Sequence, residues 1–347
     1  MKQKLQKILV IRNDKLGDFM LAFPSFAFLK QNLPETEIHA LVPTYTQALA
    51  EQSVYIDRCI TDPGEDSGVR QLLTLIRQQD YDAIITLYST SRVGICALLA
   101  RIPYRLAPAT KIAQIFYNHR LRQRRSRSEK PEYAYNLDLV KKMLVDFSVD
   151  IKPEPQTPFL TFKQETVNKI RAEFCQKHAI DNKLPIVFIH PGSGGSANNL
   201  SIKQYAEIAQ NLTQNRQLSI VISTGPGEEQ AGTEISQLLG KTPHIHYHSS
   251  EGLVRFTQHI SMADLFISGS TGPLHIAGAL DIATVGFYPR RQSATSLRWQ
   301  TLNRQDKRLA ISPPAHTDES DMSQINTKAA SDNILDYYGD IFAKTDR

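Results

Sequence analysis

Cysteine is scarce in this sequence. The three cysteines, Cys59, Cys96 and Cys175, are far apart and share none of the short spacings that metal sites and redox motifs require. We therefore expect buried, reduced thiols in a cytoplasmic protein. Short internal repeats and low-complexity tracts are also missing, which excludes solenoids and disordered tails.

Long apolar segments are missing as well. The longest run, from Phe19 to Leu29, is interrupted by Pro24 and Ser25 and is far shorter than the roughly 20 residues that span a bilayer. The basic N-terminal segment has a short apolar stretch that ends before Arg12, too short for the apolar core of a signal peptide. We expect no secretion, and membrane contact that is only peripheral.

The composition is typical of a globular protein, with 41% hydrophobic and 22% charged residues among 347. Strand-like runs at 7–11, 38–42 and 83–87 alternate with helical patterns, and this alternation resumes after residue 186. Strands separated by helices predict parallel sheets covered on both faces, and therefore an α/β fold.

Three prolines between residues 149 and 159 predict an extended linker and a domain boundary. We predict an N-terminal domain over 1–155 and a C-terminal domain over 156–315. Apolar residues recur at helical spacing near the end of the chain, at Ala330, Ile334, Tyr338 and Ile341. We expect this helical segment, 316–347, to return to the N-terminal domain and brace it.

Positive charge is concentrated in one segment. The net charge is +5, yet residues 101–130 contain nine Lys or Arg against the single acid Glu129. Such a segment attracts phosphates, anionic lipid or acidic sugars, although a solvated basic loop would have the same composition. The candidate anion-binding residues are Arg120, Arg122, Arg124 and Arg125.

A glycine turn with an aspartate follows the first predicted strand, in the sequence RNDKLGDFM. In an open parallel sheet, such a turn points into the crevice where ligands bind. Gly17 permits a tight turn and Asp18 then stands at the start of the next helix. Asp18 could serve in chemistry, or it could simply cap that helix.

Two further turns follow strands in the second half. In IHPGSGGSANN, the backbone amides around Gly194 could approach a pyrophosphate closely, and Ser193 and Ser196 add hydroxyl donors, although a simple loop has the same pattern. In STGPGEEQA, Glu228 is a candidate for contact with a nucleoside or sugar hydroxyl. Glu229 is its neighbour, and a helix-start glutamate is the alternative reading.

The most informative motif is GSTGPLHIAGAL. Thr271 suits a helix cap and Pro273 suits the first turn. The exposed amides from Gly272 onward form an anion site that the helix dipole favours, and His275 could donate a hydrogen bond to a phosphate.

The order and separation of these four motifs resemble glycosyltransferase family 9, the lipopolysaccharide heptosyltransferases. The resemblance implies a GT-B fold, with the acceptor on the first Rossmann-like domain and the nucleotide sugar on the second. It implies that Asp18 is the catalytic base of an inverting transfer, and that neither metal nor cofactor is needed. The residues that it implies for the donor are Ser193, Gly194, Ser196, Asn198, Glu228, Ser270, Thr271, Gly272 and His275.

The partners implied by the resemblance are a nucleotide sugar, ADP-heptose by default, and an acidic glycolipid, the Kdo-bearing lipid A core. The acceptor would be steered by the basic segment, at the cytoplasmic face of the bacterial inner membrane. No nucleic acid is expected.

The sequence departs from the family pattern on the donor side. Ser270 replaces the family's aspartate before Thr-Gly, Asn198 falls on a basic position, and Leu200 falls on a tryptophan. These changes suggest an altered donor or a weakened site. Alternatives are therefore a glycosyltransferase with another donor, a non-catalytic relative that binds nucleotide sugar or lipopolysaccharide, and a nucleotide-sugar epimerase of similar fold.

Three histidines, His244, His246 and His248, alternate along a predicted strand and so share one face. They could ligate a metal, but one strand face alone supplies poor tetrahedral geometry. We expect no metal site.

Overall fold

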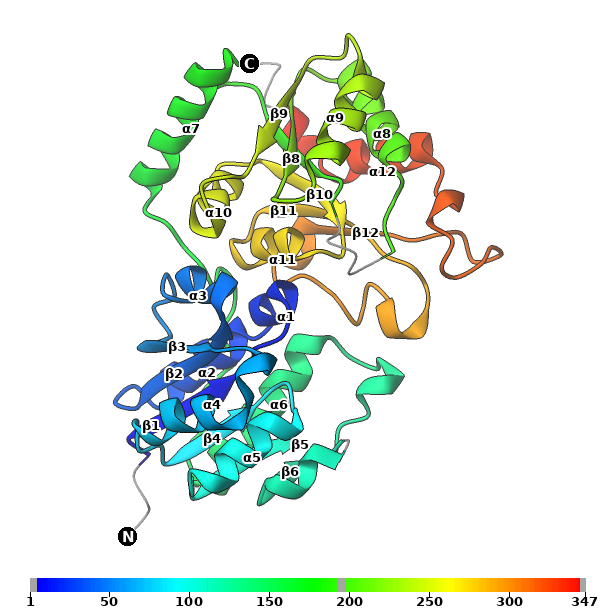
Figure 1. The fold of residues 1–347 in the computed structure, drawn as a ribbon. Helices are drawn as coiled ribbons and strands as arrows, with labels where there is room; N and C mark the ends of the chain where they lie inside the picture. Colours follow the sequence, from blue (N-terminus) through cyan, green and yellow to red (C-terminus); the bar gives the residue numbers. More distant parts are fainter. Residues whose placement is uncertain (1–4, 111, 193–197, 344–347) are drawn as a thin grey trace. The chain divides into compact units, whose positions relative to one another are not determined.

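The computed structural model describes residues 5–110, 112–192 and 198–343, and the chain divides into two compact units, residues 1–159 and 160–347 (Figure 1). The division falls at the end of the proline-rich segment, four residues after the predicted boundary. Each unit is an α/β structure built on its own parallel sheet, as the alternation of strands and helices predicted.

The first unit contains a six-stranded parallel sheet in the order β3-β2-β1-β4-β5-β6. The strands are β1 (Lys7–Ile11), β2 (Glu37–Pro43), β3 (Arg58–Asp62), β4 (Ala83–Thr86), β5 (Tyr104–Pro108) and β6 (His119–Leu121). The helices are α1 (Leu16–Met20), α2 (Phe23–Asn32), α3 (Thr44–Ala50), η1 (Glu65–Ser67), α4 (Gly68–Arg77), α5 (Ser91–Leu99), η2 (Ile112–Phe116), η3 (Arg125–Arg127) and α6 (Glu132–Asp146).

The second unit repeats this arrangement, with the order β12-β11-β10-β7-β8-β9. The strands are β7 (Ile186–His190), β8 (Ser219–Thr224), β9 (His244–His248), β10 (Leu265–Gly269), β11 (Ala283–Phe287) and β12 (Arg308–Ile311). The helices are α7 (Gln164–His178), α8 (Ile202–Asn215), α9 (Glu229–Leu239), α10 (Leu253–Ser261), α11 (Gly272–Ala279), η4 (Gln292–Ala294), η5 (Gln305–Lys307), η6 (Met322–Gln324), α12 (Thr327–Tyr337) and α13 (Gly339–Phe342).

The central strands are apolar because helices cover both faces of each sheet. In β1 the residues from Ile8 to Ile11 are fully buried, and in β7 every residue of Ile186–His190 is buried. Near-continuous apolar runs of this kind are typical of parallel sheets. Numbered within its own unit, each sheet has the order 3-2-1-4-5-6, which is the Rossmann order.

The C-terminal segment packs in the core of the second unit, and its expected return to the first domain stays a prediction. Helix α12 packs against α8, and Ile334 and Phe342 are buried in the core of this unit. The Tyr338 hydroxyl donates a hydrogen bond to the Thr284 carbonyl at 2.8 Å. The apolar face predicted from helical spacing is present, and it packs against α8.

The cysteine side chains are largely removed from solvent. Cys96 and Cys175 are buried, Cys59 is partly buried, and burial raises the pKa of the Cys96 thiol to about 11. Across the described ranges, every helix is too short or too polar to cross a bilayer.

Candidate functional site

The strand order places one ligand-binding edge in each unit. In an open α/β sheet, ligands bind beyond the carboxyl ends of the strands, where the direction of winding reverses. That point lies between β1 and β4 in the first unit and between β7 and β10 in the second. Residues 12–18 follow β1, while residues after 190 and after 269 follow β7 and β10. All four motifs found in the sequence follow strands of these two sheets.

Asp18 lies in the first turn of α1 and its carboxylate is directed to a buried arginine. The N-cap position of α1 is Lys15, whereas the Asp18 carboxylate forms an ion pair with the Arg12 guanidinium. The Asp18 side chain is only 14% exposed. The structure therefore favours a role in a charged site over the alternative role as a helix cap.

Arg12 connects three carboxylates. Its Nε lies 2.9 Å from Asp14 Oδ1, its Nη1 lies 2.9 Å from Glu132 Oε1, and its Nη2 pairs with Asp18. Arg12 is 2% exposed and Glu132 is 1% exposed. Glu132 begins α6, far along the chain, so the fold creates this cluster from two distant segments.

Arg125 completes the cluster from the other side. Its Nη1 lies 2.7 Å from Glu132 Oε1 and 3.3 Å from the Leu87 carbonyl oxygen, and its Nε donates to Gln123 Oε1 at 2.9 Å. We refer to Arg12, Asp14, Asp18, Arg125 and Glu132 as the buried charge cluster. Arg125 was expected to bind an acceptor, but its guanidinium is turned inward and engaged with Glu132.

Burial raises the pKa of Asp18, and the charge of Glu132 adds to this effect, while Arg12 opposes it. Burial likewise raises the pKa of Asp14 to about 6, against the opposing effect of Arg12. For Arg12 itself, burial favours the neutral form, but the charges of Asp14, Asp18 and Glu132 outweigh it and hold its pKa above the ordinary value. The cluster therefore contains a permanent cation beside carboxylates of increased basicity.

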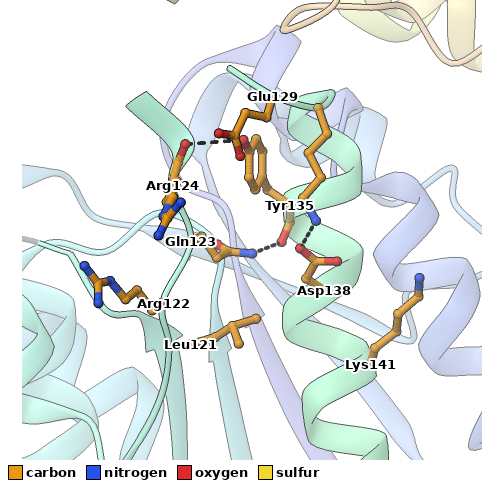
Figure 2. A pocket seen from close by; sticks show the side chains of 9 residues that line it. Leu121, Arg122, Gln123, Arg124, Glu129, Tyr135, Asp138 and Lys141 are labelled. Carbon is orange, nitrogen blue, oxygen red and sulfur yellow. Dashed lines mark hydrogen bonds and ion pairs between the residues drawn. The ribbon is translucent and has the colours of Figure 1, made fainter. Parts of the chain in front are cut away.

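A basic pocket of about 580 Å³ lies beside β6 and α6 (Figure 2). Arg122 and Arg124 are exposed on one side and Lys141 stands across from them on α6. Lys130 pairs with Asp138, and Gln123 Nε2 donates to the Tyr135 carbonyl at 2.6 Å. Arg120 is exposed on β6, outside the pocket lining. The lining residues are Leu121, Arg122, Gln123, Arg124, Glu129, Lys130, Tyr135, Asp138 and Lys141.

In the second unit the glycine-rich loop begins directly after β7. Ser193, Gly194 and Ser196, which were expected to bind the donor, lie outside the described residues. Asn198 is exposed, and its Nδ2 donates a hydrogen bond to the Ser320 carbonyl at 3.3 Å. Its partner is thus a loop of its own unit.

Glu228, rather than Glu229, lies beside the end of β7. Glu228 Oε2 accepts a hydrogen bond from the Gly225 amide at 2.8 Å and lies 3.5 Å from His190 Nε2. A side chain at Gly192 would place its Cβ 2.0 Å from Glu228 Oε1, so this carboxylate requires glycine there. Glu229 instead lies 3.6 Å from His248.

Sequence reasoning missed two residues at this edge. His190 is 4% exposed and contacts Glu228, and the signal available was a polar residue that ends the otherwise apolar strand IVFIH. Asn199 donates to the Pro191 carbonyl at 3.0 Å and would meet a Cβ at Gly269 within 2.3 Å. Asn199 thus links the ends of β7 and β10, and no local pattern in the sequence predicts this role.

The start of α11 has a buried histidine. The Thr271 hydroxyl lies 3.0 Å from Ser268 Oγ, and Gly272 and Pro273 open the helix. His275 is 2% exposed, and burial lowers its pKa to about 4. Among the residues that the structure describes, its buried Nδ1 has no hydrogen-bond partner. His275 is therefore neutral near pH 7. Ser270, which directly precedes the N-cap residue Thr271, is partly buried.

The three histidines of β9 each contact an oxygen atom of a nearby threonine. His246 Nε2 and His248 Nδ1 lie 3.1 and 3.3 Å from the Thr224 hydroxyl, and His244 Nδ1 lies 2.8 Å from the Thr242 carbonyl. Within the described part of the chain, no three His, Cys, Asp or Glu side chains are grouped as metal ligands.

Comparisons with known proteins agree with this arrangement. Residues 69–328 match the model of glycosyltransferase family 9 (heptosyltransferase). A Haemophilus influenzae protein described no more closely than as a glycosyltransferase is 43% identical over 334 residues, with 95% of each chain covered. Lipopolysaccharide heptosyltransferase 2 of Salmonella typhimurium is 22% identical, with 81% of this chain and 82% of the relative covered.

Among solved structures, the ADP-heptose lipopolysaccharide heptosyltransferase II of Escherichia coli has the same fold. Its TM-score is 0.77 at 18% identity, with 99% of this chain and 100% of the other covered. The predicted GT-B fold, with two Rossmann-like halves, is confirmed. The sequence match and the shared fold together show that the chain belongs to glycosyltransferase family 9, the heptosyltransferase family.

Proposed function

We propose that this chain is an inverting glycosyltransferase that moves a sugar, heptose by default, from a nucleotide sugar to the inner core of lipopolysaccharide or lipooligosaccharide. The observation that carries the proposal is the Asp18 carboxylate, which is partly buried beyond the carboxyl end of β1, with a raised pKa and an arginine beside it. ADP-heptose is the proposed donor because the E. coli neighbour of the same fold is described by that donor.

In the proposed reaction Asp18 accepts the proton of an acceptor hydroxyl while that oxygen attacks the anomeric carbon of the donor sugar. The bond from this carbon to the diphosphate breaks, and the nucleoside diphosphate leaves with the bonding electrons. A base is effective when its pKa is close to the working pH. Burial moves the pKa of Asp18 in that direction.

The buried charge cluster favours this proton transfer. It contains two guanidiniums, Arg12 and Arg125, and three carboxylates, Asp14, Asp18 and Glu132, and so has one negative charge in excess when all are ionised. Proton uptake by Asp18 removes that excess. We propose that Arg12, Glu132 and Arg125 are positioning residues that hold the carboxylate in place throughout the reaction.

The donor would bind at the edge formed by the ends of β7 and β10. The amides that begin α11, Glu228, and the exposed Asn198 support this placement. Neutral His275 can act there as a hydrogen-bond donor or acceptor, but it supplies no positive charge. Because Ser270 and Asn198 are uncharged, we expect the backbone amides and helix dipole of α11 to bind most of the diphosphate charge.

A panel of nucleotide sugars tests the donor. We expect ADP-heptose to raise the melting temperature more than UDP-, GDP- or CMP-sugars, because a ligand that binds only the folded state adds about 2.7 kcal/mol of stability at 100 times its Kd. Differential scanning fluorimetry measures this directly. Selective stabilisation by another nucleotide would reassign the donor, and no response from any of them would contradict the proposed transfer.

Substitutions in the basic pocket test whether it binds the acceptor. We expect the double change Arg122→Ala and Arg124→Ala to raise KM for the acidic acceptor about tenfold or more, with donor Kd unchanged, because two cations are removed from the lining. Initial rates at varied acceptor concentration measure it. The double change Arg101→Ala and Arg127→Ala is the matched control, since it also removes two exposed charges from the same segment but none from the lining. Equal effects of the pocket and control variants would show that only net charge matters.

A further inference from the structure

An apolar surface adjoins the basic segment of the first unit. Ile112 and Ile115 on η2 are 78% and 66% exposed, and Leu98 and Leu99 at the end of α5 are 43% and 45% exposed. Four of the twelve large apolar side chains that are exposed in the described residues thus fall within residues 98–115. Single exposed apolar residues are ordinary, but such a concentration marks an interaction site.

The two helices that carry these residues pack together. Phe116 of η2 lies against Gly94 of α5, where an added Cβ would approach the Phe116 ring within 2.8 Å. Arg105 Nε also donates to the Phe116 carbonyl at 3.0 Å, which fixes the end of η2 to β5. We call Leu98, Leu99, Ile112 and Ile115 the apolar edge. Helix η2, which carries two of these residues, lies between β5 and β6 in the chain, and these are the last two strands at this end of the sheet.

Positive charge flanks this edge along the chain. Exposed arginines precede and follow it in the chain, and the segment from 101 to 130 has Glu129 as its single acid. An apolar surface flanked by cations is the composition of proteins that rest on anionic bilayers. The exposed arginines are Arg101, Arg120, Arg122, Arg124 and Arg127.

We propose that the apolar edge inserts into the surface of a bilayer that contains anionic lipid, with the surrounding arginines on the headgroups. A second copy of this chain is a poorer occupant, because a twofold contact would place two basic segments against each other. The basic pocket begins at Leu121, the last residue of β6, so a lipid-linked acceptor would reach it from the same end of the unit. This last step extends the proposed function, whereas the binding surface itself does not depend on catalysis.

Vesicle flotation with the full chain, without donor or acceptor, tests the proposal. We expect binding to vesicles of phosphatidylethanolamine and phosphatidylglycerol but not to phosphatidylcholine alone, with binding weakened in 0.5 M salt. The double change Ile112→Gln and Ile115→Gln should reduce vesicle affinity about tenfold or more, because each isoleucine loses its burial in lipid. Val54→Gln is the matched control, since Val54 is 76% exposed on the same unit but outside the basic segment.

Circular dichroism of each variant establishes that the fold is retained. Absence of binding to anionic vesicles, or equal binding by wild type and the Ile112/Ile115 variant, would overturn the proposal. So would a dimer in sedimentation velocity that the same variant abolishes, since a second copy would then cover the edge. Turnover on a detergent-dispersed acceptor, measured in parallel, separates this outcome from failure of the proposed function: binding without turnover supports the surface and contradicts only the reaction.

Discussion

Replacement of Asp18 by Asn should lower kcat by about 10²–10⁴-fold and leave the Kd of the nucleotide sugar nearly unchanged. This is the usual contribution of a general base, and the amide keeps the shape of the carboxylate while losing its ability to accept the proton. Asp18 lies in the first unit, whereas the proposed donor residues lie in the second. Steady-state rates together with isothermal titration of the donor separate the two effects.

Asp14→Asn is the matched control for this substitution, because Asp14 bonds to the same arginine. Its effect on kcat should be much smaller than that of Asp18→Asn. If the Asp18 variant kept a tenth or more of the wild-type kcat, Asp18 would not be the base. A large effect of Asp14→Asn alone would move that role to Asp14.

The pH profile of the wild-type enzyme provides a second check on Asp18. The base must be ionised to accept a proton, so the rate should fall on acidification as Asp18 becomes protonated. Burial raises its pKa, and the fall should therefore begin at a higher pH than for an ordinary aspartate. The Asp18→Asn variant should lack this limb of the profile.

Replacement of Arg12 by Ala should lower the free energy of unfolding by about 3–5 kcal/mol at pH 7, because it leaves buried carboxylates without their common partner. Arg12 is 2% exposed and contacts Asp14, Asp18 and Glu132. Urea denaturation followed by circular dichroism measures the loss. Arg70→Ala, on the exposed surface of α4, should change stability by less than about 0.5 kcal/mol.

The loss in the Arg12 variant should be smaller at pH 5 than at pH 7. Without the Arg12 guanidinium, burial and mutual repulsion hold the folded-state pKa of Asp14 and Asp18 further above their unfolded values, while Arg125 still pairs with Glu132. For a group of this kind, stability is present at low pH and is lost as the pH rises through the folded-state pKa. A deficit that stayed constant between the two pH values would indicate lost packing, not unpaired charge.

Much of the fold could be predicted because its signals are local. Apolar runs such as KILVI are bounded by turns, and glycine and proline mark the starts of the helices that follow. Asp18 could be located for the same reason, since a turn after the first strand of a parallel sheet points to its ligand edge.

The rest depends on contacts between distant segments. Glu132 meets Arg12 across 120 positions, and nothing near Glu132 in the sequence identifies its partner. Arg125 lies among other basic residues in the sequence, yet in the structure its guanidinium forms an ion pair with the buried Glu132. The C-terminal helix was correctly predicted as amphipathic, but periodicity defines an apolar face without naming the surface that covers it.

That last helix has a consequence for the order in which the protein forms during translation. All strands of the first sheet have been synthesised once residue 121 is made, whereas the second sheet is complete only at residue 311. Even then α8 lacks its cover until α12, residues 327–337, has been synthesised. The nascent chain should therefore have a folded first unit attached to an incomplete second one, with apolar surface open to chaperones until α12 has been made.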